Sequence, residues 1–204
     1  MKTAEPVRTL VISTASPALS LALFEGDMLV GHDHRIIGRG HAEALMPAIA
    51  GLLGHGAADR VFVDIGPGSF TGIRIGIAAA RALGLAWGVP VCGFSGAALV
   101  AARAFALRPD LPAVTVLLDA GRGQLLASDY AATFSACATL TLAPDAVPAG
   151  VFAGAGAALL PDTTAAIVHD GLPDAAFAMA LPLAARNLPP AAHYVQPPDA
   201  ILPL

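Results

Sequence analysis

The sequence predicts an α/β protein built as two similar lobes. Short β-branched runs alternate with alanine-rich helical stretches, and the order of elements in the first half returns in a weaker form in the second. With 204 residues, 56% of them hydrophobic and 13% charged, the chain can bury a sizeable core. We expect a first lobe over residues 1–100 and a second, degenerate lobe with a proline-rich tail over residues 101–204.

Three strands open the first half. Residues 7–13 and 20–25 are rich in aliphatic side chains, and residues 28–37 follow after a turn at Gly26 and Asp27. This order, three strands joined by short turns, predicts an antiparallel meander.

A helix is expected next, over residues 41–53. Leu45, Ile49 and Leu53 recur every four residues and therefore share one side of that helix. His41 and Glu43 stand at its start, which we expect to be exposed, so that a capping or interface role is favoured over acid–base catalysis.

Residues 61–87 contain the most informative motif. Residues 61–65 (VFVDI) predict a buried strand, residues 66–72 (GPGSFTG) a loop with unusual backbone freedom, and residues 73–87 a helix. A glycine loop before a helix N-terminus can hold an anion. This loop lacks the lysine and the spacing of a P-loop, so a structural turn is favoured over a phosphate site. The candidate phosphate residues are Gly66, Gly68, Ser69, Thr71 and Gly72.

The helix over residues 73–87 is apolar nearly all round and rich in Gly and Ala, which predicts burial on more than one side. Arg74 and Arg81 are seven residues apart and share one face, with Ile77 and Ala78 between them. One side must cover the protein's own sheet. The other, together with the helix over 41–53, can form a docking surface for another lobe or another protein.

The second half repeats the pattern after a short strand at 90–93. Strands are expected over residues 114–119, 124–130 and 136–142, with a glycine turn at 121–123. A further strand over 151–156 precedes a helix over 175–187 that Pro182 interrupts, and the tail from residue 189 should be extended.

Charge excludes several classes of function. The formal net charge is −4, Lys2 is the only lysine, and no basic run occurs, so autonomous nucleic-acid binding is not expected. The uncharged stretch over 82–102 is broken by Gly and Pro, which argues against a membrane span, and the first residues do not form a hydrophobic signal segment. We expect a cytoplasmic protein with no membrane contact.

Candidate metal and nucleophile sites are weak. His32 and His34 should face the same side of their strand, but no third ligand follows at motif spacing, so no functional metal site is expected. Cys92 and Cys137 are too few for a disulfide framework, and no G-x-S-x-G elbow supports a serine hydrolase.

Four motifs together resemble the TsaB (YeaZ) family, bacterial proteins needed to make threonylcarbamoyladenosine in tRNA and related to the TsaD transferases. The motifs are residues 66–76 (GPGSFTGIRIG), 39–47 (RGHAEALMP), 119–124 (DAGRGQ) and 194–200 (YVQPPDA). The resemblance implies the actin/Hsp70-like ATPase (ribonuclease H-like) fold, with mixed sheets and flanking helices in two lobes. That fold agrees with the repeat inferred from the residues alone.

The resemblance also implies a non-catalytic subunit. It would act as a dimerising scaffold or activator of a TsaD-type transferase, together with the ATPase TsaE, and would reach tRNA only through that complex. Alone, it would form a homodimer. No cofactor is expected, although the loop leaves open weak nucleotide binding. The alternative is a nucleotide-binding ATPase or kinase of actin-like fold that uses residues 66–72 and Asp119. The residues assigned to the partner surface are His41, Glu43, Leu45, Ile49, Arg74, Ile77, Ala78 and Arg81.

This chain departs from the family pattern at two places and lacks one feature of the TsaD relatives. The first strand ends in Ser13-Thr14 where the family has Asp-Thr, which argues against ATP hydrolysis. Gln196 stands where the family has Arg, which puts any contact of that arginine in doubt. Residues 94–100 (FSGAALV) lack the His pair that holds the metal in TsaD relatives, so the resemblance predicts no catalytic metal.

Overall fold

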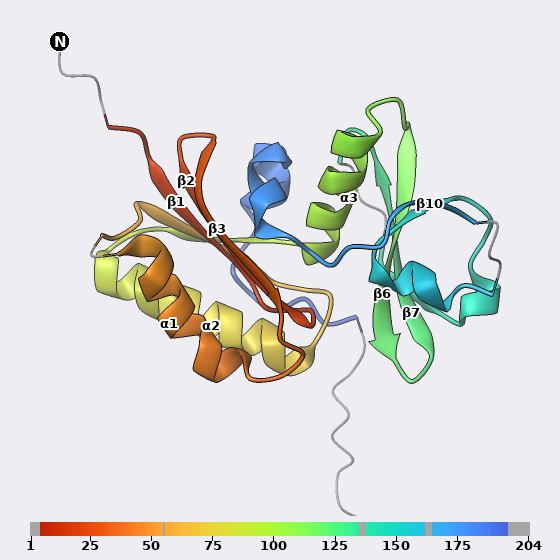
Figure 1. The fold of residues 1–204 in the computed structure, drawn as a ribbon, viewed down its shortest axis with the longest axis horizontal. Helices are drawn as coiled ribbons and strands as arrows, with labels where there is room; N and C mark the ends of the chain where they lie inside the picture. Colours follow the sequence, from red (N-terminus) through yellow and green to blue (C-terminus); the bar gives the residue numbers. More distant parts are fainter. Residues whose placement is uncertain (1–4, 55, 135–137, 162–164, 196–204) are drawn as a thin grey trace, which may run out of the picture.

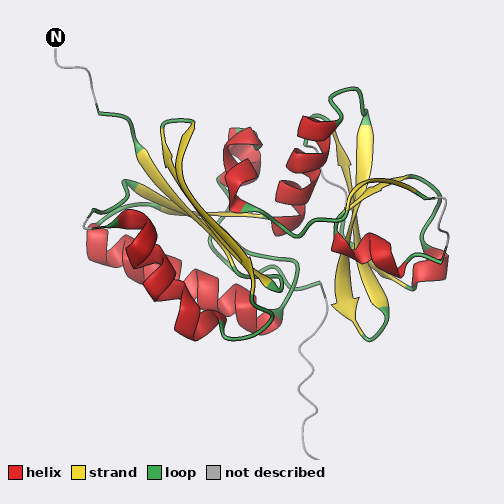
Figure 2. Cartoon of the chain, in the orientation of Figure 1, coloured by secondary structure: helices red, strands yellow, loops and turns green. Residues whose placement is uncertain are grey.

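The computed structural model describes residues 5–54, 56–134, 138–161 and 165–195. Two five-stranded mixed sheets form two lobes, and one helix, α3, stands between them (Figure 1). Two long helices cover the outer face of the first sheet, whereas the outer face of the second sheet carries only short helical turns in the described part of the chain (Figure 2).

The first sheet has the strand order β3-β2-β1-β4-β5. Strands β1 and β2 pair antiparallel, as do β2 and β3, whereas β4 and β5 run parallel to β1. The predicted meander is therefore present, followed by two parallel strands. The strands are β1 (Arg8–Ser13), β2 (Ala18–Glu25), β3 (Met28–Ile36), β4 (Arg60–Asp64) and β5 (Val91–Phe94).

The second sheet has the order β10-β9-β6-β7-β8, in which β6 takes the place that β1 has in the first sheet. It pairs antiparallel with β7 and parallel with β9, so the topology of the first lobe is repeated. This repeat is the actin-like arrangement that the sequence predicts. The strands are β6 (Ala113–Gly121), β7 (Gln124–Ala131), β8 (Leu140–Leu142), β9 (Val151–Ala153) and β10 (Ala166–His169).

The second lobe is the degenerate one. The first lobe connects its parallel strands through α1 (His41–Leu53) and α2 (Phe70–Trp87), whereas the second uses the 3-10 turns η1 (Pro144–Ala146) and η2 (Ala155–Leu159). Strand β10 was not predicted, and the strand expected over 136–142 begins at Leu140, with residues 135–137 outside the described residues.

Helices α1 and α2 cover the outer face of the first sheet. The alternation of β1 sends Leu10 and Ile12 toward these helices, where they meet Leu45 and Ile73 in one core cluster. Val11 points to the other face, toward α3.

Helix α3 (Gly96–Leu107) was missed by the sequence analysis, which expected turns and a short strand across residues 82–102. Eight of its twelve residues are buried, so it has no exposed polar face and no helical period in its sequence. Leu99 and its neighbours belong to a core cluster that also holds Phe24 of the first sheet and Val116 of the second. The proposed lobe boundary at residue 100 falls inside this helix.

The C-terminal segment returns to the first lobe. The helix expected over 175–187 is instead two 3-10 helices, η3 (Ala175–Ala180) and η4 (Leu183–Arg186), with Pro182 between them. Leu188 then bridges to Gly93 of β5, and the His193 backbone N–H donates to the Ile65 carbonyl oxygen at 2.8 Å. Gln196 lies outside the described residues.

No helix within the described part of the chain is long and apolar enough to cross a membrane.

Candidate functional site

The glycine loop is fitted tightly against the turn between β1 and β2. The Gly66–Pro67 peptide bond is cis, and Gly68 has a φ of +155°. A Cβ atom at Gly68 would overlap the Ala15 carbonyl oxygen, which also accepts the Ser69 N–H at 2.7 Å. The glycine is therefore required by close backbone approach, as the motif predicts.

Ser69 is the N-cap of α2. Its Oγ accepts the Gly72 N–H at 3.2 Å, and its carbonyl oxygen accepts the Ile73 N–H at 2.9 Å. The backbone N–H groups of Gly72 and Ile73, which could otherwise bind an anion, therefore already have hydrogen-bond acceptors. Thr71 is exposed.

Asp64 is the polar centre of this region, and the sequence analysis did not single it out. It ends β4 and is fully buried. Its Oδ1 accepts the backbone N–H groups of Gly66 and Gly96 at 2.9 Å each, and its Oδ2 accepts the Ser13 hydroxyl at 2.7 Å. Burial raises the pKa of Asp64 to about 6, against the lowering effect of these three hydrogen bonds. A carboxylate at the end of a buried strand, just before a glycine loop, was the available signal.

Ser13 is thereby explained as the partner of Asp64. An acid at position 13, as in the family pattern, would stand beside the buried Asp64 carboxylate, and two like charges at that separation cannot both ionise easily. The hydroxyl removes this conflict and supplies a hydrogen-bond donor instead.

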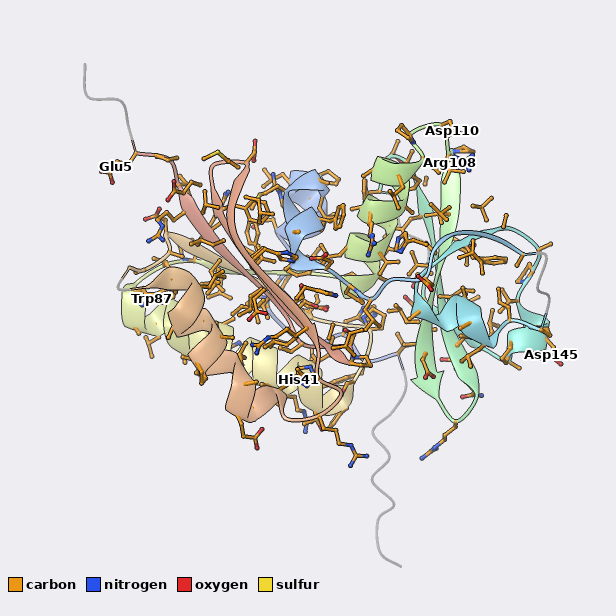
Figure 3. The ribbon with its side chains drawn as sticks, viewed as in Figure 1. Glu5, His41, Trp87, Arg108, Asp110 and Asp145 are labelled. Atoms are coloured by element: carbon orange, nitrogen blue, oxygen red, sulfur yellow. The ribbon has the colours of Figure 1, made fainter. Side chains whose placement is uncertain are left out.

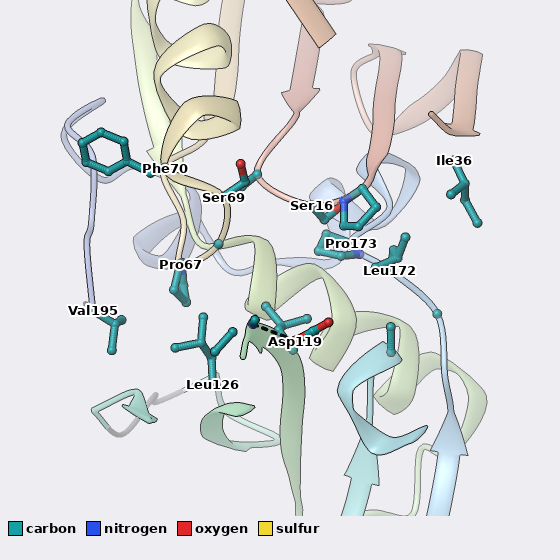
Figure 4. A pocket seen from close by; sticks show the side chains of 18 of the residues that line it. Ser16, Ile36, Pro67, Ser69, Phe70, Asp119, Leu126, Leu172, Pro173 and Val195 are labelled. Atoms are coloured by element: carbon teal, nitrogen blue, oxygen red, sulfur yellow. Dashed lines mark hydrogen bonds between the residues drawn. The ribbon is translucent and has the colours of Figure 1, made fainter. Parts of the chain in front are cut away.

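A cleft of about 820 Å³ separates the lobes next to the loop (Figure 4). Its size is that of a small-molecule site. Of the five candidate phosphate residues, Gly68 and Ser69 line it, whereas Gly66, Thr71 and Gly72 do not. Asp119 reaches it from β6 in the second lobe, and its Oδ1 accepts the Gly121 N–H at 2.7 Å.

Charged side chains at the cleft come from both lobes. Arg103 of α3, Asp119 and Asp170 line it, as does His34. Arg103 lies 6.0 Å from the centre of the Phe177 ring. Positive and negative groups are therefore both present, without the concentration of cations that a polyphosphate requires.

The predicted partner residues divide between the core and the surface of α1 and α2. Leu45 and Ile49 are 1% and 2% exposed, and Ile77 is buried too, so these three face the sheet. His41, at the start of α1 (Figure 3), is also buried, which corrects the expectation that it is exposed. Its Nε2 lies 3.3 Å from the Ala18 carbonyl oxygen, so it joins α1 to β2. The exposed members are Glu43, Arg74, Ala78 and Arg81.

Both arginines of α2 contact the C-terminal segment of the same chain. Arg74 Nε donates to the Tyr194 hydroxyl at 3.0 Å, and its guanidinium lies 3.6 Å from the centre of the Phe70 ring. Arg81 Nη2 donates to the Pro190 carbonyl oxygen at 2.8 Å. They therefore fix the C-terminal segment along α2, a role that the sequence did not indicate.

The rest of the outer face of α1 and α2 is weakly charged and apolar. Leu85 of α2 is 87% exposed and Met46 of α1 is 47% exposed. The two helices contact each other and lie side by side in Figure 1, so their exposed faces form one continuous surface. We call this surface the α1–α2 face; it comprises Ala42, Glu43, Met46, Ala50, Ala78, Ala82 and Leu85.

Repeated sheets of this topology, with a cleft between them at the glycine loop, define a two-lobed protein of the actin-like class. A family model described as "TsaD: tRNA N6-adenosine threonylcarbamoyltransferase" matches residues 35–147, more than half of the chain. The chain belongs to this family.

Similar known proteins include some named TsaB and YeaZ. The chain is 30% identical over 129 residues to the tRNA threonylcarbamoyladenosine biosynthesis protein TsaB of Escherichia coli, covering 61% of this chain and 55% of that protein. An uncharacterized protein of Mycobacterium tuberculosis is 41% identical over 91 residues, which cover 41% of this chain and 43% of that protein. The solved structure of YeaZ from Pseudomonas aeruginosa aligns with a TM-score of 0.73 at 27% identity, over 85% of this chain and 89% of that one. The chain spans about half the length of the curated relatives it matches.

Proposed function

We propose that this protein is a non-catalytic subunit in the formation of threonylcarbamoyladenosine in tRNA, at the adenosine beside the anticodon. It would bind and activate a TsaD-type transferase, together with a TsaE-type ATPase. The named TsaB relatives support the pathway. The observation that carries the subunit role is the α1–α2 face, where a large aliphatic side chain, Leu85, is 87% exposed.

The buried polar groups beside the glycine loop support a non-catalytic role. The Ser13 hydroxyl is bound to Asp64, and the Asp64 carboxylate is held by two backbone N–H groups, so both serve the loop's structure. The formal net charge of −4 further favours tRNA contact through the partners.

The partner contact can be tested by co-purification with the TsaD-type protein of the same organism, sized by light scattering. We expect a one-to-one complex. The Leu85→Glu variant should bind at least about tenfold more weakly, because an unpaired carboxylate would be buried in the interface. Leu140→Glu is the matched control, since Leu140 is 56% exposed on β8 of the other lobe. Equal binding by both variants would exclude the α1–α2 face.

The same face is the proposed surface of a homodimer. An exposed apolar patch on a monomer can meet its own copy across a two-fold axis. Leu85→Glu should therefore shift the isolated protein toward the monomer in sedimentation velocity, whereas Leu140→Glu should leave the oligomeric state unchanged.

The alternative is a nucleotide-binding ATPase or kinase of actin-like fold. The cleft of about 820 Å³ beside Gly68, Ser69 and Asp119 favours it. Titration of the isolated protein with ATP and Mg²⁺ tests this reading, with Ala155→Phe, a change in the cleft wall, as the blocking variant. Stoichiometric binding that this variant abolishes would favour the enzyme over the subunit. Gly68→Val is not a suitable blocking variant, because the valine side chain would displace Ala15 and distort the loop itself.

A further inference from the structure

Three potential metal ligands from distant parts of the chain meet on the inner face of the first sheet. His32 and His34 lie on β3, and Asp174 lies 140 residues later, at the start of η3. One ligand atom from each, two ring nitrogens and a carboxylate oxygen, lies within 4.8 Å of the others. The sequence places the two histidines on one side of their strand and predicts no functional metal site, because Asp174 reaches the pair only through the returning C-terminal segment.

The sheet register fixes the two histidines. His34 stands opposite Ser20 and His32 opposite Ala22, so both face α3 and η3 rather than α1 and α2. The two rings stack with centres 6.1 Å apart. Since alternate residues of a strand share a face, this placement follows from the spacing of the pair.

Asp174 is held in position by bonds of its own. Its Oδ1 accepts the Ala176 N–H at 3.0 Å, and the neighbouring Ala175 N–H donates to Ser20 Oγ at 2.9 Å. The Asp174 side chain is 14% exposed, and those of His32 and His34 are 34% and 24% exposed. The ligand atoms are thus partly shielded but open to an ion from solvent.

The separations suit a tetrahedral ion. Asp174 Oδ1 lies 2.8 Å from His32 Nε2 and 3.9 Å from His34 Nδ1. Zinc bonds of about 2.1 Å in a tetrahedron place neighbouring ligand atoms about 3.4 Å apart. The two observed distances bracket this value, and the remaining pair, a ring nitrogen of His32 and one of His34, lies within 4.8 Å. Side-chain rotations that also release His34 Nδ1 from its 3.0 Å contact with Ser20 Oγ would bring all three atoms around one ion.

We propose that His32, His34 and Asp174 form a binding site for a divalent transition metal, with Zn²⁺ as the preferred ion. Two imidazoles and one carboxylate are a donor set that zinc sites use, whereas Mg²⁺ and Ca²⁺ favour oxygen ligands. The metal replaces the proton that joins His32 to Asp174. A water completes the coordination, and since His34 also lines the cleft, that fourth position lies at the cleft's edge.

The ion would join β3 of the first sheet to the segment that leads from β10 into η3. This role is independent of the proposed subunit function, because the α1–α2 face lies on the opposite side of the sheet.

Calorimetric titration of the chelator-treated protein with Zn²⁺ tests the site. We expect one equivalent to bind to the wild type. Loss of one hydrogen-bonding partner around a metal weakens binding by about 10–100-fold, so loss of a ligand in His34→Asn should weaken it by at least about 100-fold. Asp174→Asn should also weaken binding while keeping the N-cap, since Asn accepts the same Ala176 N–H. His193→Asn, which changes an exposed histidine outside the cluster, is the matched control.

Circular dichroism checks the fold of each variant, and if His34→Asn does not fold, the nearly isosteric Asp174→Asn decides the result. Cobalt(II) substitution of the wild type gives a second readout that needs no variant. A strong visible d–d band indicates the tetrahedral site, and the weak spectrum of octahedral cobalt contradicts it. Absence of stoichiometric zinc, or binding that is unchanged in both cluster variants, would overturn the proposal.

Discussion

Asp64 connects three segments of the first lobe through a single carboxylate. It binds the end of β1 through Ser13, the glycine loop through Gly66, and the start of α3 through Gly96. Gly96 is required there, because a Cβ atom would overlap the carboxylate. The loop geometry and the position of the central helix therefore depend on one buried acid.

The raised pKa of Asp64 predicts a pH-dependent stability. Burial raises the pKa of Asp64 in the folded protein to about 6, whereas the carboxyl of the unfolded chain has its ordinary pKa of 3.8. The folded state thus binds more protons between these values, and the free energy of unfolding should fall as the pH rises from about 4 to 6. Between pH 4.5 and pH 7.5 this loss amounts to about 2 kcal/mol. Urea unfolding at pH 4.5 and pH 7.5 measures this loss.

Asp64→Asn isolates the contribution of this residue from that of other carboxylates. An asparagine oxygen can still accept from Gly66 and Gly96, and it does not ionise. The variant should therefore lose less stability than the wild type over the same pH interval. If both proteins lose the same amount, Asp64 does not titrate in this range.

At the scale of a helix, replacing glycine by alanine should have opposite effects on stability at two positions. A Cβ atom at Gly72, in the first turn of α2, would overlap the Thr14 carbonyl oxygen, whereas one at Gly51 in α1 meets no atom within 4 Å. Gly72→Ala should destabilise the protein by about 1–3 kcal/mol through overpacking. Gly51→Ala should stabilise it by about 0.5–1 kcal/mol, since alanine favours the helix. Chemical denaturation of the two variants compares them directly, and a stable Gly72→Ala protein would contradict the close approach of α2 to the β1–β2 turn.

The elements that the sequence predicted well carry a local signal, either a turn-bounded aliphatic run or a helical period. Aliphatic runs joined by short turns identified the meander, and the recurrence of Leu45, Ile49 and Leu53 gave α1 its observed bounds. Helix α3 has no such period, because it is buried between two sheets, and its start at Gly96 depends on a bond to Asp64. The 3-10 form of η3 and η4 also had no local signal beyond Pro182.

The site residues show the same contrast between local sequence signals and contacts that depend on the tertiary fold. The glycine loop was predictable, because its Gly-Pro-Gly sequence indicates a turn with unusual backbone freedom. The meeting of Asp174 with His32 and His34 was not, because it depends on where the chain returns after the second sheet. His41 was predicted to be exposed at its helix start, but the position of β2 beneath α1 buries it.

At the scale of the whole molecule, the two lobes share a core. The cluster around α3 contains Val11 and Phe24 from the first sheet, Val116 and Tyr130 from the second, and Ala178 from η3. Because η3 and η4 bring the chain back to the first sheet, that lobe is built from both ends of the sequence. Removal of α3 would expose apolar surface on both sheets.

This shared core predicts a single cooperative unfolding transition, and Leu125→Ala tests it across the lobes. Leu125 is fully buried on β7 in a cluster confined to the second lobe, and its truncation should destabilise that lobe by about 2–5 kcal/mol. Trp87, the only tryptophan, reports on α2 in the first lobe. If the lobes unfold together, Leu125→Ala should lower the midpoint of the Trp87 fluorescence transition as much as that of the far-ultraviolet circular dichroism. Leu99→Ala in α3 is the reference variant, because it removes contacts to the shared core itself. A Trp87 transition that stays in place in Leu125→Ala while the circular dichroism splits into two steps would mean that the second lobe unfolds independently.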